Sequence, residues 1–324
     1  MALTTLLLGA TQLVVPGTAS ETPSLRTQLL EAEFIGLVRP GARELFGSSP
    51  NHPAARQCEQ VELEIVEVWR GDAAETLNVS YPANTLRPRA PQLPKGELRL
   101  VFLGRGVGGD WQVLGPTVAN RQSATHSEEL LASYHAAFQS WFQLDALALD
   151  ERPMAEYRWL ITQFRSSDLR ERVVPELAGR SIQQSWQPGA FSMQASQEPA
   201  NFWLSAWPEV SLFSAQGGSL LALLRQSDAD VAAGWLVGQL DSKWQDAKRK
   251  EWAQLLASLT VLSGDARYVD TDRGEAAAHR FLDHWFEADA AGLDKAELKP
   301  AYLQLRVELL DWLTQAEAVH RLPW

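Results

Sequence analysis

Apolar and polar residues alternate through the first third of the chain, which is the pattern of half-buried β-strands. Between residues 57 and 69, Val61, Leu63 and Ile65 alternate with glutamine and glutamate. The alternation slips by one residue at Ile65 and Val66, which predicts a β-bulge or a strand that passes between two packed faces. Other short strands are expected at residues 33–38, 76–81, 97–103 and 111–114. Five such strands separated by turn signals predict a small Greek-key barrel of the OB type.

After Pro116 the apolar period changes to 3.6 residues, which is typical of amphipathic helices. Thr125 and Glu128 have the spacing of a capping box. One face of the helix that follows carries Leu130, Tyr134, Phe138 and Trp141. Further helices are expected at residues 153–166, from 168 onwards, within 220–240, and at 243–262, 275–289 and 298–320.

Two stretches of the helical half share a pattern of helix, Arg-x-Ser-Asp turn and second helix, at residues 159–177 and 220–240. Their turn arginines, Arg165 and Arg225, are 60 positions apart. The second stretch resembles the turn and second helix of a HEAT-type repeat. Pro175 is expected to break the second helix of the first stretch, and the offset exceeds the usual HEAT period. The pattern therefore favours paired antiparallel helices over a regular repeat array.

These patterns predict a two-domain α+β protein. We expect a signal peptide at residues 1–20, an OB-like β domain at 21–118, and an α-helical domain at 119–324. The domain boundary should lie between Pro116 and His126, where alternation ends and helical periodicity begins. A long irregular insertion is expected at residues 181–218, which is too long for a simple connector.

The N-terminus carries an apolar stretch from Ala2 to Val15, shorter than the roughly 20 residues of a membrane span. Pro16 and Gly17 interrupt it, and the small residues around Ala19 fit a signal-peptidase site. A basic segment before the apolar stretch is missing, so an N-terminal helix packed on the domain is the alternative. Cleavage after about 20 residues predicts an exported protein, periplasmic or extracellular.

Charge and cysteine content restrict the partners. The formal net charge is -11, and no run of lysine or arginine could follow a phosphate backbone, so a nucleic acid partner is not expected. No membrane span is expected once the signal peptide is removed. Cys58 is the sole cysteine, which excludes an intrachain disulfide. We expect it to be a buried strand-end residue; a nucleophile assisted by His52 is the alternative.

The sequence contains only weak matches to catalytic motifs. Gly104, Gly106 and Gly109 satisfy G-x-G-x-x-G, but the following residues read as a strand, so a hairpin turn is expected instead of a dinucleotide site. The only metal-ligand candidates, all weak, are His279, Asp283 and His284 on one expected helix, where a solvated surface is the alternative. No cofactor is expected, and no catalytic residue is assigned.

Three tryptophans fall within the insertion, beside glutamine and asparagine side chains: Trp186, Trp203 and Trp207. Aromatic planes next to amides are typical of a saccharide or peptide groove, so these residues are predicted to bind a ligand. In the alternative interpretation, the indoles are plugs that fix a long loop to its domain.

Residues 61–72, VELEIVEVWRGD, resemble a strand and turn common in exported bacterial domains related to netrin modules and tissue inhibitors of metalloproteinases. Residues 97–103 resemble a second strand of that family. The resemblance implies an OB fold over roughly residues 31–116. Inhibitors of this family chelate the protease zinc through an N-terminal cysteine, and no cysteine lies near a plausible mature N-terminus here, so inhibition by that route is not implied.

Together these features predict an exported, non-enzymatic binding or interaction protein with a protein or saccharide ligand. Stacked helix pairs provide extended surfaces for such partners. The alternative is an envelope hydrolase with a carboxylate-based site in the cleft between the domains, where ligand sites are frequent.

Overall fold

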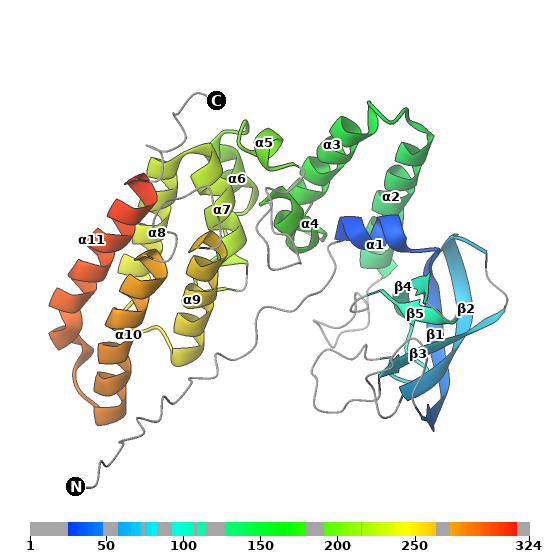
Figure 1. Ribbon diagram of the computed structural model, residues 1–324, viewed down its shortest axis with the longest axis horizontal. Coiled ribbons are helices and arrows are strands. Elements are labelled where there is room, and N and C mark those ends of the chain that lie inside the picture. The colour runs from blue at the N-terminus through cyan, green and yellow to red at the C-terminus, as the bar shows by residue number, and fades with distance from the viewer. Residues whose placement is uncertain are drawn as a thin grey trace, which may run out of the picture.

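The computed structural model describes residues 25–47, 58–72, 75–82, 93–106, 109–114, 128–166, 168–178, 191–214, 216–263 and 273–315. In Figure 1 a small β-barrel lies at one end of the molecule and the helices extend away from it. This is the two-part architecture that the change of period predicts. The expected signal peptide, the capping-box Thr125, the boundary at residues 116–126, His52 and Trp186 lie outside the described residues.

Five strands close into a barrel in the order β1-β2-β3-β5-β4, with β4 pairing back onto β1. The pair β3 and β5 is parallel and the other pairs are antiparallel, which is the strand arrangement of an OB barrel. The barrel interior is apolar and includes Phe34, Val61, Leu63 and Trp111. The strands are β1 (Phe34–Phe46), β2 (Cys58–Arg70), β3 (Thr76–Pro82), β4 (Arg99–Arg105) and β5 (Trp111–Val113).

The slip in the alternation of β2 corresponds to a bulge. Leu37 pairs with Glu67 and Val38 pairs with Ile65, so Val66 is the extra residue. A second irregularity follows at Trp69, because Gly36 pairs with Val68 and Ile35 pairs with Arg70. Each extra residue interrupts the regular alternation of faces along the strand. Ile65 consequently packs on the barrel interior, whereas Trp69 packs in the core outside the barrel.

The glycine-rich segment forms the hairpin between β4 and β5. The Gly106 N–H donates to the Asp110 carbonyl at 2.9 Å, and the Gly109 N–H donates to the Gly106 carbonyl at 2.9 Å. Gly109 has φ +80°, a left-handed conformation that glycine adopts without strain. The predicted hairpin is confirmed. Cys58 is the first residue of β2 and is fully buried, as expected for a strand-end cysteine.

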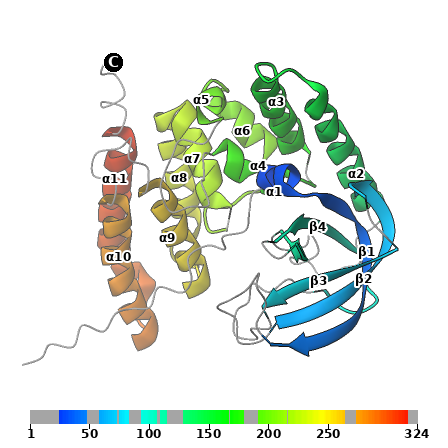
Figure 2. The ribbon, with the colours of Figure 1, turned by 45° about the vertical axis from the view of Figure 1, so that its right-hand side comes forward.

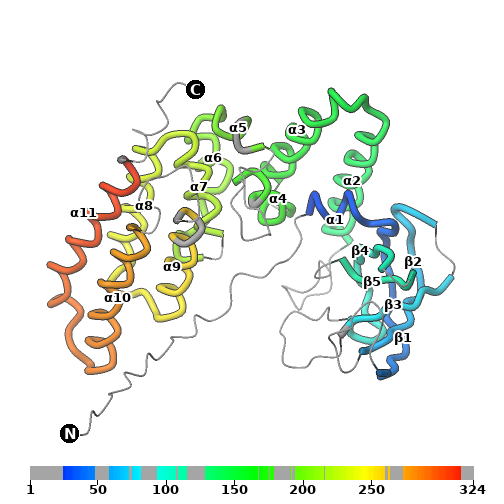
Figure 3. Tube along the Cα trace, viewed as in Figure 1, coloured from blue at the N-terminus to red at the C-terminus, as the bar shows by residue number. Residues whose placement is uncertain are grey.

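Helices precede and follow the barrel, and Figure 3 traces the chain through them in alternating directions. None of the described helices combines the length and apolarity needed to cross a bilayer. They are α1 (Leu25–Glu31), α2 (Glu128–Phe142), η2 (Gln143–Ala146), α3 (Arg152–Arg165), α4 (Arg170–Leu177), α5 (Ser192–Ala195), α6 (Ala200–Ala206), α7 (Gly217–Ser227), α8 (Ala229–Lys243), α9 (Arg249–Ser263), α10 (Arg273–Ala291), η3 (Lys295–Leu298) and α11 (Lys299–Gln315).

The two related stretches both form helix pairs, α3 with α4 and α7 with α8. Asp228 in the second turn caps α8 by accepting the Val231 N–H at 3.0 Å. The expected break at Pro175 is wrong, because α4 continues through it to Leu177. Pro175 is the sixth of eight helical residues, so its missing N–H removes one bond near the helix end.

The segment 181–218, expected to be irregular, contains the short helices α5 and α6, and α7 begins at Gly217. The single-turn α5 and the two-turn α6 are too short to show a clear 3.6-residue period in the sequence. Helix α1 was also not expected, for the same reason. It leads directly into β1 and lies between the barrel and the other helices, as Figures 1 and 2 show.

Candidate functional site

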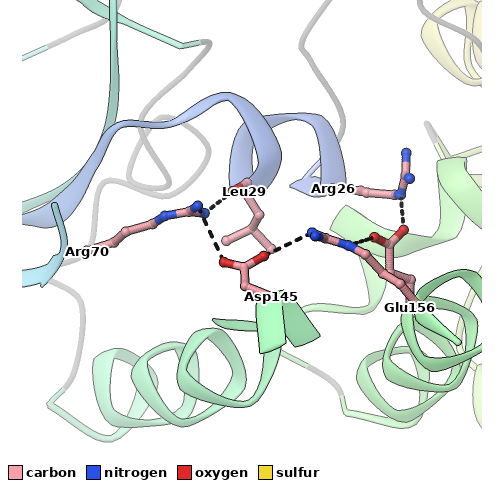
Figure 4. A network of polar contacts seen from close by, with 6 residues as sticks. Arg26, Leu29, Arg70, Asp145 and Glu156 are labelled. Atoms are coloured by element: carbon pink, nitrogen blue, oxygen red, sulfur yellow. Dashed lines mark hydrogen bonds and ion pairs between the residues drawn. The ribbon is translucent and has the colours of Figure 1, made fainter. Parts of the chain in front are cut away.

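A network of charged side chains joins the barrel to α1, η2 and α3 (Figure 4). We call these five residues, Arg26, Arg70, Asp145, Arg152 and Glu156, the junction network. Successive ion pairs connect them from Arg70 at the end of β2 to Arg26 in α1. The network therefore bridges elements that lie far apart in the sequence.

Arg70 connects the barrel to α1 and η2. Its Nη1 donates to the Leu29 carbonyl at 2.6 Å, and its Nη2 lies 3.5 Å from Asp145 Oδ2. Leu29 is in the last turn of α1, where carbonyls lack intrahelical partners, so a cation here stabilises the helix end. The guanidinium also lies over the Phe142 ring at 5.4 Å.

Arg152 and Glu156 lie one turn apart near the start of α3. Arg152 donates from Nη2 to Asp145 Oδ1 at 3.0 Å and from Nε to Glu156 Oε1 at 2.8 Å. Glu156 Oε2 accepts from Arg26 Nε at 2.8 Å. The Glu156 side chain is only 4% exposed. Each of its oxygens is thus committed to an arginine, as a buried carboxylate requires.

A second carboxyl group, Glu176 in α4, lies in the same region. Burial raises the pKa of Glu176, neighbouring Glu156 raises it further, and Arg26 opposes both. The junction thus holds one carboxylate paired with two arginines and one carboxyl group that retains its proton to higher pH. Pairs of carboxyls with contrasting environments can act as base and acid, so this is the described place that best fits the carboxylate chemistry of the hydrolase alternative.

The geometry of Glu156 fits a structural role better than a catalytic one. A general base needs an oxygen within hydrogen-bonding reach of the substrate. Both Glu156 oxygens are directed at arginines, and the side chain is almost completely buried. The pairing fixes α1 against α3 and leaves no oxygen of Glu156 directed at solvent.

Gln28 of α1 provides a second polar connection. It is fully buried, and its Nε2 donates to the Leu114 carbonyl at 2.6 Å, just after β5. Its Oε1 accepts a hydrogen bond from Arg172 of α4, whose guanidinium lies 6.0 Å from the centre of the Phe102 ring of β4. One side chain of α1 therefore ties the barrel to α4.

Aromatic packing completes the junction. Trp69 of β2 stacks on His135 of α2, with ring centres 4.8 Å apart and planes 19° apart. Trp69 and Phe102 of the barrel each place a ring against Phe138 of α2, edge to face, at 5.8 and 5.7 Å. One continuous core includes these barrel residues and extends to Trp312 of α11. The barrel and the helices therefore share a hydrophobic core.

Two of the three tryptophans predicted to bind a ligand are buried. Trp203 is fully buried and donates from Nε1 to Ser227 Oγ at 2.9 Å, and Trp207 is 6% exposed. Both indoles meet the Phe164 ring of α3 edge to face, at 5.1 and 6.0 Å. These contacts fix α6 against α3 and α7, as the plug interpretation expects for these two residues. A ligand contact through Trp186 stays a prediction.

The weak metal candidates lie on the exposed side of α10. His279, Asp283 and His284 all face solvent, and His279 Nε2 is 3.7 Å from Glu275 Oε1, one turn earlier. Within the described ranges, no three or more His, Cys, Asp and Glu side chains gather in a way that could hold a metal ion.

No pattern in the sequence predicts the junction network. Arg26 and Glu156 are 130 positions apart, and neither belongs to a motif. A local signal existed for one pair only, since Arg152 and Glu156 have the i, i+4 spacing of a helical ion pair. Comparison of the chain with protein-family models, curated proteins and solved structures gives no match.

Proposed function

We propose that this is a non-enzymatic interaction protein in which the barrel and the helices act as one platform. The observation that carries the proposal is the shared core, which runs from Trp69 and Phe102 on the outside of the barrel into the helices. Domains joined by a small polar interface move relative to each other, whereas a large apolar interface opposes such motion. A fixed arrangement suits the recognition of a large partner by both parts.

The junction network supports the same proposal over the hydrolase alternative. Its carboxylates Asp145 and Glu156 each pair with at least one arginine from another element, so their charges stabilise the arrangement of α1, η2 and α3. Glu176 has the raised pKa expected of a general acid. A hydrolase would require a second carboxylate with an oxygen available to the substrate, and Glu156 does not offer one.

We further propose that the protein is exported and that its barrel is related to the netrin-like domains. The strand order of the barrel supports this relation, as does the structural use of the shared motif. Trp69 packs in the core between barrel and helices, and Gly71 has φ +85° with the Glu33 carbonyl 2.0 Å from the position of an added Cβ. These motif residues serve the fold. The paired helices α3–α4 and α7–α8 are likewise proposed to be HEAT-like.

The proposed ligand is a protein or a saccharide, bound through the segment 181–218 with Trp186 as its aromatic contact. The test is a binding screen of the purified protein against a glycan array and against proteins of the cell envelope. We expect the ligand to be recovered chemically unchanged, and Trp186→Ala to weaken binding about tenfold or more with an unaltered melting temperature. Trp203→Ala is the control for a structural indole and should lower the melting temperature strongly.

A different result would support the hydrolase. If the bound compound is cleaved, and if Glu176→Gln abolishes cleavage without lowering the melting temperature, the junction is an active site and the proposal fails.

A further inference from the structure

Helix α11 closes the helical half of the molecule. Figures 1 and 2 place it at the end of the molecule away from the barrel. Among the described elements it packs on α8, α10 and η3. Its inner face is buried and carries Tyr302, Leu305, Leu309, Trp312 and Leu313.

The outer face of α11, the last helix that the structure describes, carries an apolar stripe, whereas the terminal helix of an array normally presents a polar surface. The stripe consists of Pro300, Leu303, Val307, Leu310 and Thr314. Leu303 is 47% exposed and Val307 is 58% exposed, while Leu310 is partly buried. None of the five residues is charged, so the stripe is a continuous uncharged seam along the helix.

The spacing of the stripe is that of a coiled coil. Successive members are three, four, three and four residues apart, so they occupy the a and d positions of a heptad repeat. Pro300, Val307 and Thr314 fall at a, and Leu303 and Leu310 fall at d. β-branched residues at a with leucine at d favour two parallel strands. The seam therefore fits one further helix that runs in the same direction.

The charges beside the seam fit a second copy of the same helix. Arg306 is at position g, and Asp311 is at position e of the following heptad. In a parallel pair, each g residue lies opposite the partner's e residue five positions later. Arg306 of each copy would therefore lie opposite Asp311 of the other copy, which gives two such pairs. An antiparallel pair would instead place g beside g and e beside e, which brings like charges together.

Both residues are accessible from outside. Arg306 Nε is 3.4 Å from Asp241 Oδ1, and Asp311 pairs with Arg273, yet their side chains are 36% and 38% exposed. These internal pairs hold both side chains at the edge of the seam and leave them partly exposed. The side chains therefore lose less conformational entropy when they form a pair between two helices.

We propose that the protein forms a homodimer through α11, with the two copies of the helix parallel about a twofold axis. The interface is isologous: Leu303, Val307 and Leu310 of one chain contact the same residues of the other. The dimer presents two barrels at opposite ends, which would let two copies of a ligand be bound together.

Sedimentation velocity of the purified chain over a range of micromolar concentrations tests the dimer. We expect a dimer for the wild type, and we expect Val307→Lys to raise the dissociation constant about tenfold or more because a charge enters the seam. Leu149→Lys is the matched control, since Leu149 is 88% exposed in the turn before α3, away from α11. It should leave the dimer unchanged. Equal melting temperatures of the two variants at a concentration where both are monomeric would show that both fold.

The orientation is tested by cross-linking. Thr314→Cys should form an interchain disulfide with its own copy under mild oxidation, because position a lies next to its symmetry mate in a parallel pair. The native Cys58 is buried in β2 and should not react. A monomeric wild type, or a Val307→Lys variant that still dimerises, would overturn the proposal. Cross-linking of Thr314→Cys only when mixed with Leu303→Cys would overturn the parallel arrangement.

Discussion

Glu156 is the residue through which α1 and α3 are held together. Replacing it with glutamine removes the negative charge that Arg26 and Arg152 share, and it leaves one of these arginines facing an amide NH₂ group, which cannot accept its hydrogen bond. We expect Glu156→Gln to lower the free energy of unfolding by about 1–3 kcal/mol. Urea denaturation at pH 7 measures this difference.

The matched control for this substitution is Glu151→Gln, five residues earlier and exposed. It should change stability by less than about 0.5 kcal/mol. Carboxylates held for catalysis often destabilise the fold, so their removal stabilises the protein. A gain in stability for Glu156→Gln would therefore contradict the structural role assigned to this residue.

The raised pKa of Glu176 predicts that the free energy of unfolding depends on pH. Burial raises its pKa above the ordinary 4.5, so the folded state binds this proton more tightly than the unfolded state does. Its contribution to stability is fully present below pH 4.5 and is lost as the pH rises through the raised value. Glutamine imitates the protonated form. The free energy of unfolding of the wild type should therefore fall relative to Glu176→Gln as the pH rises above 4.5, and a constant difference would contradict the shift.

Elements with a long, regular period could be predicted from the sequence. The bulge in β2 followed from the adjacent apolar residues Ile65 and Val66, and α2 from its apolar face. Elements of one or two turns, such as α1 and α6, could not be predicted, because so short a helix forms only when tertiary contacts stabilise it. Pro175 shows the converse error, since tertiary packing tolerates a proline close to a helix end.

Helix pairs in this protein approach closely at glycine. A Cβ added to Gly218 of α7 would lie 2.7 Å from the Ser258 Cα of α9, which is backbone and cannot move alone. We expect Gly218→Ala to destabilise the protein by about 1–3 kcal/mol through this overlap. Thermal unfolding followed by circular dichroism measures the change.

Gly238 in α8 provides the opposite case for the same substitution. Among the described residues, no heavy atom beyond its chain neighbours and its own helix backbone lies within 4 Å of its added Cβ, so Gly238→Ala should gain helix propensity and stabilise the protein by about 0.5–1 kcal/mol. If both substitutions change stability in the same direction, close helix packing does not explain the effect of Gly218→Ala.

At the scale of the whole molecule, the sequence predicted the two parts but not how they are joined. The barrel and the helical half each follow from a period within one segment. The junction depends on Arg70, Asp145 and Glu156, which come from separate segments, and ion pairs between distant residues leave no periodic signal. The burial of Trp203 and Trp207 could not be predicted either. Both pack on Phe164, which is distant in sequence, and the amide residues beside them give no indication of this contact.

The central claim is that the barrel and the helices form one structural unit through their shared core. Differential scanning calorimetry of the intact chain tests it most directly, because units that share a core unfold together. We predict a single transition whose calorimetric enthalpy equals its van't Hoff enthalpy. Two separate calorimetric transitions would contradict the claim, above all if circular dichroism shows that the helical signal is lost in the first while the β-sheet signal remains.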